Sequence, residues 1–241
     1  MEKWYVYSKK ADFNAIGQQY GISPVTARIL RNRDVVGEEA IARYLRGNLS
    51  DLYSPWLLKD MDKAVAILMD KIEKGKTIRV VGDYDIDGVC STYILTGGLR
   101  NCGANVDCEI PDRLKDGYGI NIHILEAALE DGVDTVITCD NGISALDQIA
   151  FAKENNMTVI VTDHHDVPYE ELENGTKKYL LVHADAVVNP KQEDCGYPYE
   201  GICGAVVAFK VVQALYEKME VRHDVIDDFL EFAAIATVGD V

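Results

Sequence analysis

Three short acidic clusters in this sequence each follow a run of apolar residues. They are Asp83-Tyr84-Asp85-Ile86-Asp87-Gly88, Asp140-Asn141-Gly142 and Asp163-His164-His165. Carboxylate oxygens, together with some imidazole nitrogen, are the ligands that Mg²⁺ and Mn²⁺ prefer. A pair of such ions about 3.5–4 Å apart can activate water and stabilise both oxygens of a phosphoryl displacement. The residue types therefore predict a site for hard divalent cations, with Asp240 as a further candidate.

The spacing of Asp83, Asp85 and Asp87 leaves two local structures open. In a strand, alternate side chains share a face, so all three carboxylates would point the same way. In a turn they would point apart, and an isolated Asp-x-Asp is commonly a solvated turn. Gly82 and Gly88 allow sharp backbone bends on either side. Because two further acidic clusters follow other apolar runs, we favour a shared site.

The hydrophobic pattern predicts an α/β fold, a mostly parallel sheet flanked by helices. Short β-branched runs predict buried strands at 77–81, 104–110, 134–139, 157–162 and 186–188. Helical periodicity predicts helices at about 60–75, 91–100, 120–130, 143–154, 205–217 and 225–236. Strands that alternate with helices of this length form βαβ units. In such sheets ligands bind at the carboxyl ends of strands, where the acidic clusters would lie.

The chain is expected to contain two parts of different charge. Residues 1–50 are a small, mainly helical lead-in, in which Ser23 and Pro24 begin one helix and residues 37–45 form another. Residues 51–241 form the larger domain. The lead-in carries a net charge of +3 and the remainder −19. The total of −16 argues against nonspecific nucleic-acid binding by the whole surface, so local patches or protein outside this chain would provide it.

Composition indicates a soluble globular protein. The six cysteines form no C-x-x-C pair and several lie in apolar runs, which predicts reduced, mostly buried thiols. No apolar stretch approaches the roughly 20 residues that span a bilayer. The first residues lack the layout of a signal peptide. We therefore expect a cytoplasmic protein without membrane association.

Four residues outside the acidic clusters are candidate substrate contacts. Arg113 could hold a phosphate and Tyr118 could stack on a base, although a surface turn is the alternative for both. Gly204 opens a helix whose free N–H groups could bind an anion, and a plain helix start is equally consistent. Asn189 precedes Pro190 in a turn and is a candidate polar contact to the site.

Together these residues resemble the DHH phosphoesterase superfamily, and within it the bacterial single-strand-specific 5′→3′ DNA exonucleases. The resemblance covers nearly the whole chain. The segments 81–88, 140–142 and 236–241 are similar to the first, second and fourth catalytic motifs. It implies the catalytic metal ligands Asp83, Asp85, Asp87, Asp140, His164 and Asp240, with Asp140 bridging and His165 contacting the scissile phosphate. Many members carry a His where this chain has Val81, and Asp83 is its candidate replacement.

The resemblance also implies an activity. A hydrolase with two Mn²⁺ or Mg²⁺ ions would release 5′-mononucleotides from single-stranded DNA in repair and recombination. Single-stranded DNA would be one partner, and a single-strand-binding protein or a helicase another. Such proteins carry further domains after the catalytic core, including an oligonucleotide-binding domain. This chain ends before them, so we expect the fragment to be weakly active.

Two other functions remain open. A DHH-type hydrolase of cyclic dinucleotides, short oligonucleotides or pyrophosphate would use the same metal ligands. The lead-in and the segment 113–119 favour the exonuclease over this alternative. A non-catalytic binding module of the same fold would be expected to have lost ligands, whereas this chain keeps them.

Overall fold

The chain comprises two structural units. A computed structural model describes residues 3, 9–114, 117–172, 174–222 and 224–240. Contacts divide the chain into residues 1–52 and residues 53–241. The division lies two residues beyond the boundary that the sequence predicts.

The first unit contains three short helices, α1 (Phe13–Tyr20), α2 (Pro24–Asn32) and α3 (Glu38–Arg46), and the 3-10 helix η1 (Leu49–Asp51). Ser23 caps α2 as predicted, because its hydroxyl accepts a hydrogen bond from the Thr26 amide at 3.0 Å and Pro24 is the first helical residue. The sequence does not predict α1. Ala27, Leu30 and Ile41 are the buried apolar residues of these helices.

The second unit is built on a five-stranded parallel sheet. Its strands are β1 (Thr77–Val81), β2 (Asn105–Glu109), β3 (Thr135–Cys139), β4 (Thr158–Thr162) and β7 (Ala186–Val188), in the order β2-β1-β3-β4-β7. Each begins and ends within one residue of its predicted range. The chain moves from β1 to one side for β2 and then to the other side for β3. This reversal makes the carboxyl ends of β1 and β3 a topological switch point, where α/β proteins bind ligands.

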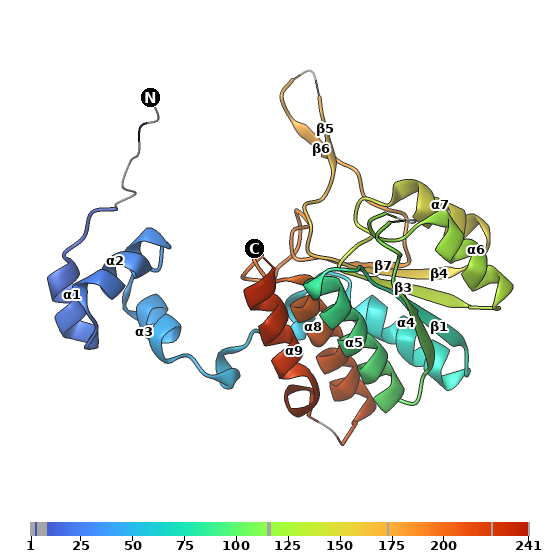
Figure 1. The fold of residues 1–241 in the computed structure, drawn as a ribbon, viewed down its shortest axis with the longest axis horizontal. Helices are drawn as coiled ribbons and strands as arrows, with labels where there is room; N and C mark the ends of the chain where they lie inside the picture. Colours follow the sequence, from blue (N-terminus) through green and yellow to red (C-terminus); the bar gives the residue numbers. More distant parts are fainter. Residues whose placement is uncertain (1–2, 4–8, 115–116, 173, 223, 241) are drawn as a thin grey trace. The chain divides into compact units, whose positions relative to one another are not determined.

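Helices cover both faces of the sheet, as Figure 1 shows. The helices α4 (Met61–Glu73), α5 (Ile86–Asn101) and α8 (Gly204–Met219) cover one face, and α9 (Val225–Gly239) packs against α5 and α8. The helices α6 (Ile122–Glu130) and α7 (Leu146–Glu154) cover the other face. Ile78 and Val80 of β1 face the first group, whereas Val81 faces the second. The alternation buries both faces, as the predicted α/β fold requires.

A two-stranded hairpin and a short 3-10 helix of this unit are absent from the predictions. A hairpin of β5 (Tyr169–Glu171) and β6 (Lys177–Tyr179) projects from the unit (Figure 1). Its residues are exposed and mostly polar, so they lack the apolar run that predicts a buried strand. The short 3-10 helix η2 (Pro55–Leu57) precedes α4.

The cysteines are free thiols, and Cys90, Cys102, Cys139 and Cys203 are buried. In the described part of the chain, no helix combines the length and apolar character needed to cross a membrane.

Candidate metal centre

The Asp83–Gly88 segment joins β1 to α5. Asp85 is the N-cap of α5, and its Oδ1 atom accepts a hydrogen bond from the Gly88 amide at 2.9 Å. Asp87 lies in the first helical turn, where a negative charge interacts favourably with the helix dipole. Because Asp is a strong capping residue, the helix begins at Ile86, about five residues before its predicted start. The strand-like alternation that would align the three carboxylates does not occur.

The Asp140 turn follows β3 directly. Asp140 has a left-handed backbone conformation, with φ of 61°, which is unfavourable for a residue other than glycine. The buried side chain of Asn141 holds this turn, because its Nδ2 atom donates to the main-chain oxygens of Cys139 at 2.9 Å and Gly82 at 3.0 Å. One amide thereby ties the ends of β1 and β3 together beneath the site. Sequence reasoning did not assign this role to Asn141.

Asp163 begins the turn after β4 and points into the protein. Its Oδ2 atom accepts from the Ile143 amide at 2.9 Å and its Oδ1 atom from the His164 amide at 2.7 Å. The same Oδ1 lies 2.7 Å from Nδ1 of His165. Burial alone would raise the pKa of Asp163, but these contacts, above all that with His165, hold it below its usual value. Asp163 therefore orients His165, a role that the sequence predictions did not include.

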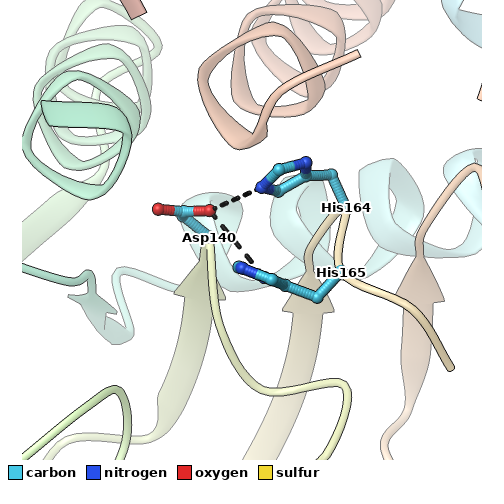
Figure 2. Close-up of side chains that lie close together, drawn as sticks. All are labelled: Asp140, His164 and His165. Carbon is cyan, nitrogen blue, oxygen red and sulfur yellow. Dashed lines mark ion pairs between the residues drawn. The ribbon is translucent and has the colours of Figure 1, made fainter. Parts of the chain in front are cut away.

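His164 points toward the carboxylates of the other clusters. Its Nε2 atom lies 3.1 Å from Asp140 Oδ1, 3.4 Å from Asp87 Oδ2 and 3.9 Å from Asp240 Oδ2. Figure 2 shows both histidine rings approaching the Asp140 carboxylate, with His165 Nδ1 at 4.0 Å. The turn after β4 thus joins the start of α5 and the ends of β3 and α9 in one cluster.

Three overlapping groups of side chains offer ligand atoms that lie within 4.8 Å of one another. They are Asp83, Asp85 and Asp140; Asp87, His164 and Asp240; and Asp140, His164 and His165. Asp140 belongs to the first and third groups and approaches His164 of the second. This is the position expected of a bridging carboxylate. The structure brings together every residue that the resemblance implies as a ligand, and their individual roles stay predictions.

Two buried oxygens of this centre, Asp83 Oδ2 and Asp140 Oδ1, accept no hydrogen bond within the described residues. The Nε2 atom of His164 lies 3.1 Å from Asp140 Oδ1, but the two atoms lack hydrogen-bond geometry. Burial, and then the charges of Asp87 and Asp85, raise the pKa of Asp140 to about 10. Burial also raises the pKa of Asp83.

Within the described part of the chain, the ion pairs of these carboxylates involve histidine and neither Lys nor Arg. A buried carboxylate without a partner is strongly destabilising, and a divalent cation would relieve this. The donor set of carboxylates and one imidazole therefore fits Mn²⁺ or Mg²⁺.

The amino terminus of α8 holds one of the carboxylates. The Gly204 amide donates to Asp87 Oδ2 at 2.6 Å, and the Ala205 amide donates to Asp87 Oδ1 at 2.8 Å. A Cβ atom on Gly204 would lie 2.7 Å from Cβ and 2.8 Å from Oδ1 of Asp140, so only glycine leaves room there. The anion expected at this helix start is thus a side chain of the protein itself. A substrate contact of Gly204 stays a prediction.

The other predicted substrate residues lie around the same centre. The Arg113 guanidinium lies over the ring of Tyr84, 5.3 Å from its centroid. The Tyr118 hydroxyl donates to the main-chain oxygen of Asp140 at 2.9 Å. Asn189 is fully buried, and its Nδ2 atom donates to the main-chain oxygen of His165 at 3.0 Å. Asn189 therefore supports the histidine turn, and its predicted substrate contact remains untested.

A profile of the "DHH family, N-terminal domain" matches residues 77–237, from β1 almost to the end of α9. This chain belongs to the DHH family. It is 34% identical over 240 residues to the single-stranded-DNA-specific exonuclease RecJ of Bacillus subtilis. The matched region covers 99% of this chain and 28% of that protein. It is 35% identical over 213 residues to RecJ of Thermus thermophilus, covering 86% of this chain and 30% of the relative. This DHH chain thus spans about a third of the length of these relatives.

Solved structures of RecJ share the fold. A crystal structure of exonuclease RecJ bound to manganese superposes with a TM-score of 0.66 at 34% identity, covering 79% of this chain and 45% of the other. RecJ of Thermus thermophilus in complex with Mn²⁺ gives a TM-score of 0.64 at 31% identity, covering 84% and 28%. Both relatives hold manganese, which agrees with the donor set of this DHH chain.

Proposed function

We propose that this chain is the catalytic part of a metal-dependent exonuclease that hydrolyses phosphodiester bonds of single-stranded DNA. The observation that carries the proposal is the convergence of carboxylates and His164 at the switch point, without a paired Lys or Arg among the described residues. The relatives named single-stranded-DNA-specific exonucleases support DNA as the substrate. We assign the chemistry to the unit of residues 53–241, with residues 1–52 as the lead-in.

The residues divide into two ligand sets and one substrate contact. Asp83, Asp85 and Asp140 would hold one ion. Asp87, His164 and Asp240 would hold the other, with Asp140 shared between the ions. Bound Mn²⁺ or Mg²⁺ would supply a water of lowered pKa and positive charge against the phosphate. His165, oriented by Asp163, is then left to contact the scissile phosphate.

The finer parts of the proposal are the direction, product, biological role and partners. We propose 5′→3′ digestion to 5′-mononucleotides in DNA repair and recombination, with a single-strand-binding protein or a helicase as partner. Residues 51–241 carry a charge of −19, which is unfavourable for holding DNA. Because the relatives are about three times as long, we assign most of the DNA grip to protein outside these residues. We expect this chain alone to be weakly active.

The test compares four substrates in Mn²⁺, using this chain and the chain extended to the length of its relatives. The substrates are 5′-labelled and 3′-labelled single-stranded DNA, a cyclic dinucleotide and pyrophosphate. Immediate release of labelled mononucleotide from the 5′-labelled strand supports the proposal. Hydrolysis confined to the two small substrates would replace it with the small-substrate phosphoesterase. Absence of hydrolysis together with absence of calorimetric Mn²⁺ binding would indicate a non-catalytic module.

A further inference from the structure

The loop before α6 is fastened to the metal centre by three consecutive residues. The Tyr118 hydroxyl donates to the Asp140 main-chain oxygen at 2.9 Å and the Gly119 amide to Asp83 Oδ1 at 3.3 Å. The Ile120 amide donates to Asn141 Oδ1 at 3.2 Å. These bonds reach the ends of both β1 and β3. The place of the Tyr118 side chain is therefore set by the same strand ends that carry the carboxylates.

Glycines on both sides of Tyr118 make this fastening possible. Gly117 and Gly119 have left-handed φ angles of 78° and 68°, which L side chains rarely adopt. A Cβ atom on Gly119 would lie 3.0 Å from Cβ of Asn141, so the loop backbone packs directly on the Asp140 turn. Tyr118 is thereby presented toward His165 by a close backbone contact.

The Tyr118 hydroxyl also reaches His165. Its oxygen lies 3.2 Å from Nε2 of His165, and the two rings meet edge to face with centroids 5.8 Å apart. A hydroxyl has one hydrogen, and the Asp140 main-chain oxygen can only accept. The Tyr118 oxygen is then left to accept from the Nε2–H group. At the other ring nitrogen, Nδ1, the neighbour is the Asp163 carboxylate at 2.7 Å.

We propose that Tyr118 is a positioning residue, whose hydroxyl ties the ring of His165 to the Asp140 turn. Asp163 holds one edge of the ring and Tyr118 the other, so the ring cannot rotate away from the carboxylates. This role differs from base stacking, which would use the face of the Tyr118 ring and would not need its hydroxyl. The inference rests on the proposed function for its kinetic test and on geometry alone for its spectroscopic test.

The kinetic test uses the full-length protein, Mn²⁺ and labelled single-stranded DNA. Tyr118→Phe removes the hydroxyl and keeps the ring, and we expect kcat to fall about 10–100-fold with little change in KM. Tyr118→Leu should lose at least as much kcat. The matched control is Tyr93→Phe, because Tyr93 is 52% exposed against 51% for Tyr118 and its ring packs against Phe229 and Phe232 of α9. If Tyr118→Phe left kcat and KM unchanged while Tyr118→Leu raised KM, the role of Tyr118 would be base stacking and the proposal would be overturned.

The spectroscopic test needs no activity. In Mg²⁺, ¹H–¹⁵N spectra of the histidine rings should show an exchange-protected Nε2–H signal of His165, assigned by its loss in His165→Gln. We expect Tyr118→Phe to lose this protection and Tyr93→Phe to keep it. A protected signal in Tyr118→Phe would overturn the proposal even if the wild-type protein digests no DNA. Failure of the proposed function would instead appear as an inactive wild type with the Tyr118-dependent signal intact.

Discussion

The carboxylates near the amino ends of the parallel strands (the amino edge) and those at the carboxyl ends (the carboxyl edge) have different kinds of partner. From the middle of β1, Arg79 lies 2.7 Å from Asp107 Oδ2 in the neighbouring strand β2 and 2.9 Å from Asp131 Oδ2, which lies ahead of the amino end of β3. Asp134, just before β3, pairs with Lys71 and with Lys76. Each of these three acids has a cation supplied by the protein. At the carboxyl ends, the ion-pair partners of Asp87, Asp140 and Asp240 within the described residues are histidines.

The difference separates structural charges from functional ones. The ion pairs with Arg79 and Lys71 are complete without any ligand, and the two carboxylate side chains beside Arg79 are 46% and 61% exposed. At the carboxyl edge Asp83, Asp87 and Asp140 are almost fully buried. Asp83 Oδ2 and Asp140 Oδ1 are buried without a hydrogen-bond partner among the described residues, which is unfavourable for the ionised carboxylates, and protonation or a bound cation would relieve this.

Removing the shared carboxylate should abolish activity. Asp140→Asn keeps the size of the side chain but weakens its interaction with both ligand groups. We expect hydrolysis of single-stranded DNA by the full-length protein to fall on the order of 1000-fold. Asp131→Asn, at the amino edge, is the matched control and should leave the rate unchanged. A rate for Asp140→Asn within tenfold of wild type would contradict a bridging role.

Adding one methyl group at the start of α8 should weaken metal binding. Gly204→Ala places its Cβ against Asp140 and disturbs the amide that holds Asp87. We expect Mn²⁺ affinity, measured by calorimetry, to fall about 10–100-fold. Gly196→Ala is the control, because its nearest contact would be 3.8 Å from Leu57 O. Equal affinity of the two variants would show that α8 does not position the carboxylates.

Divalent cations should stabilise the fold through the carboxyl edge alone. Mn²⁺ at 100 times its Kd should add about 2.7 kcal/mol to the free energy of unfolding, and the Tm should rise. The same Mn²⁺ concentration should leave the Tm of Asp140→Asn almost unchanged. An equal rise in both proteins would place the stabilising ion elsewhere, and the Asp131→Asn variant should respond like wild type.

In EDTA, one substitution at each edge should change stability with opposite signs. The pKa of Asp140 is about 10 in the folded protein and about 4 in an unfolded chain. The folded state therefore holds an extra proton between these values, and its stability falls as pH rises through this window. Asp140→Asn has no carboxyl group to titrate at this position, so it does not lose stability in this way. It should be more stable than wild type at pH 7 by at least about 1 kcal/mol, and the difference should grow toward pH 9.

Asp134→Asn is the opposite case. Burial alone would raise the pKa of Asp134. The hydrogen bonds from Lys71 and Thr135, together with the charges of Lys71 and Lys76, lower this pKa overall. Its stabilisation is present above the unfolded pKa and disappears as pH falls through the folded value. We expect Asp134→Asn to be less stable at pH 7 by about 1 kcal/mol or less, with no difference near pH 2. Chemical denaturation across pH, with EDTA throughout, measures both variants. Changes of the same sign would contradict the contrast between the edges.

The strands, their order along the chain and the acids that follow them are all encoded locally in the sequence. The range 77–81 and the range 186–188 agree with the structure to the residue, because a buried β-branched run bounded by Gly, Asp or Asn is a local signal. Parallel strands then place their carboxyl ends on one edge. This placement explains why residue types and spacing suffice to assign Asp83, Asp140 and His164 to one site.

How the side chains of that site are held depends on tertiary structure. Asp87 receives hydrogen bonds from the amides of Gly204 and Ala205, which lie 117 and 118 positions further along the chain. Asp163 turns inward to orient His165, and Tyr118 reaches the same ring from the loop before α6. Local propensity and hydrophobic periodicity act over a few residues and say nothing about such pairs. Only the packing of α8 and this loop against the strand ends brings the donors within hydrogen-bonding distance.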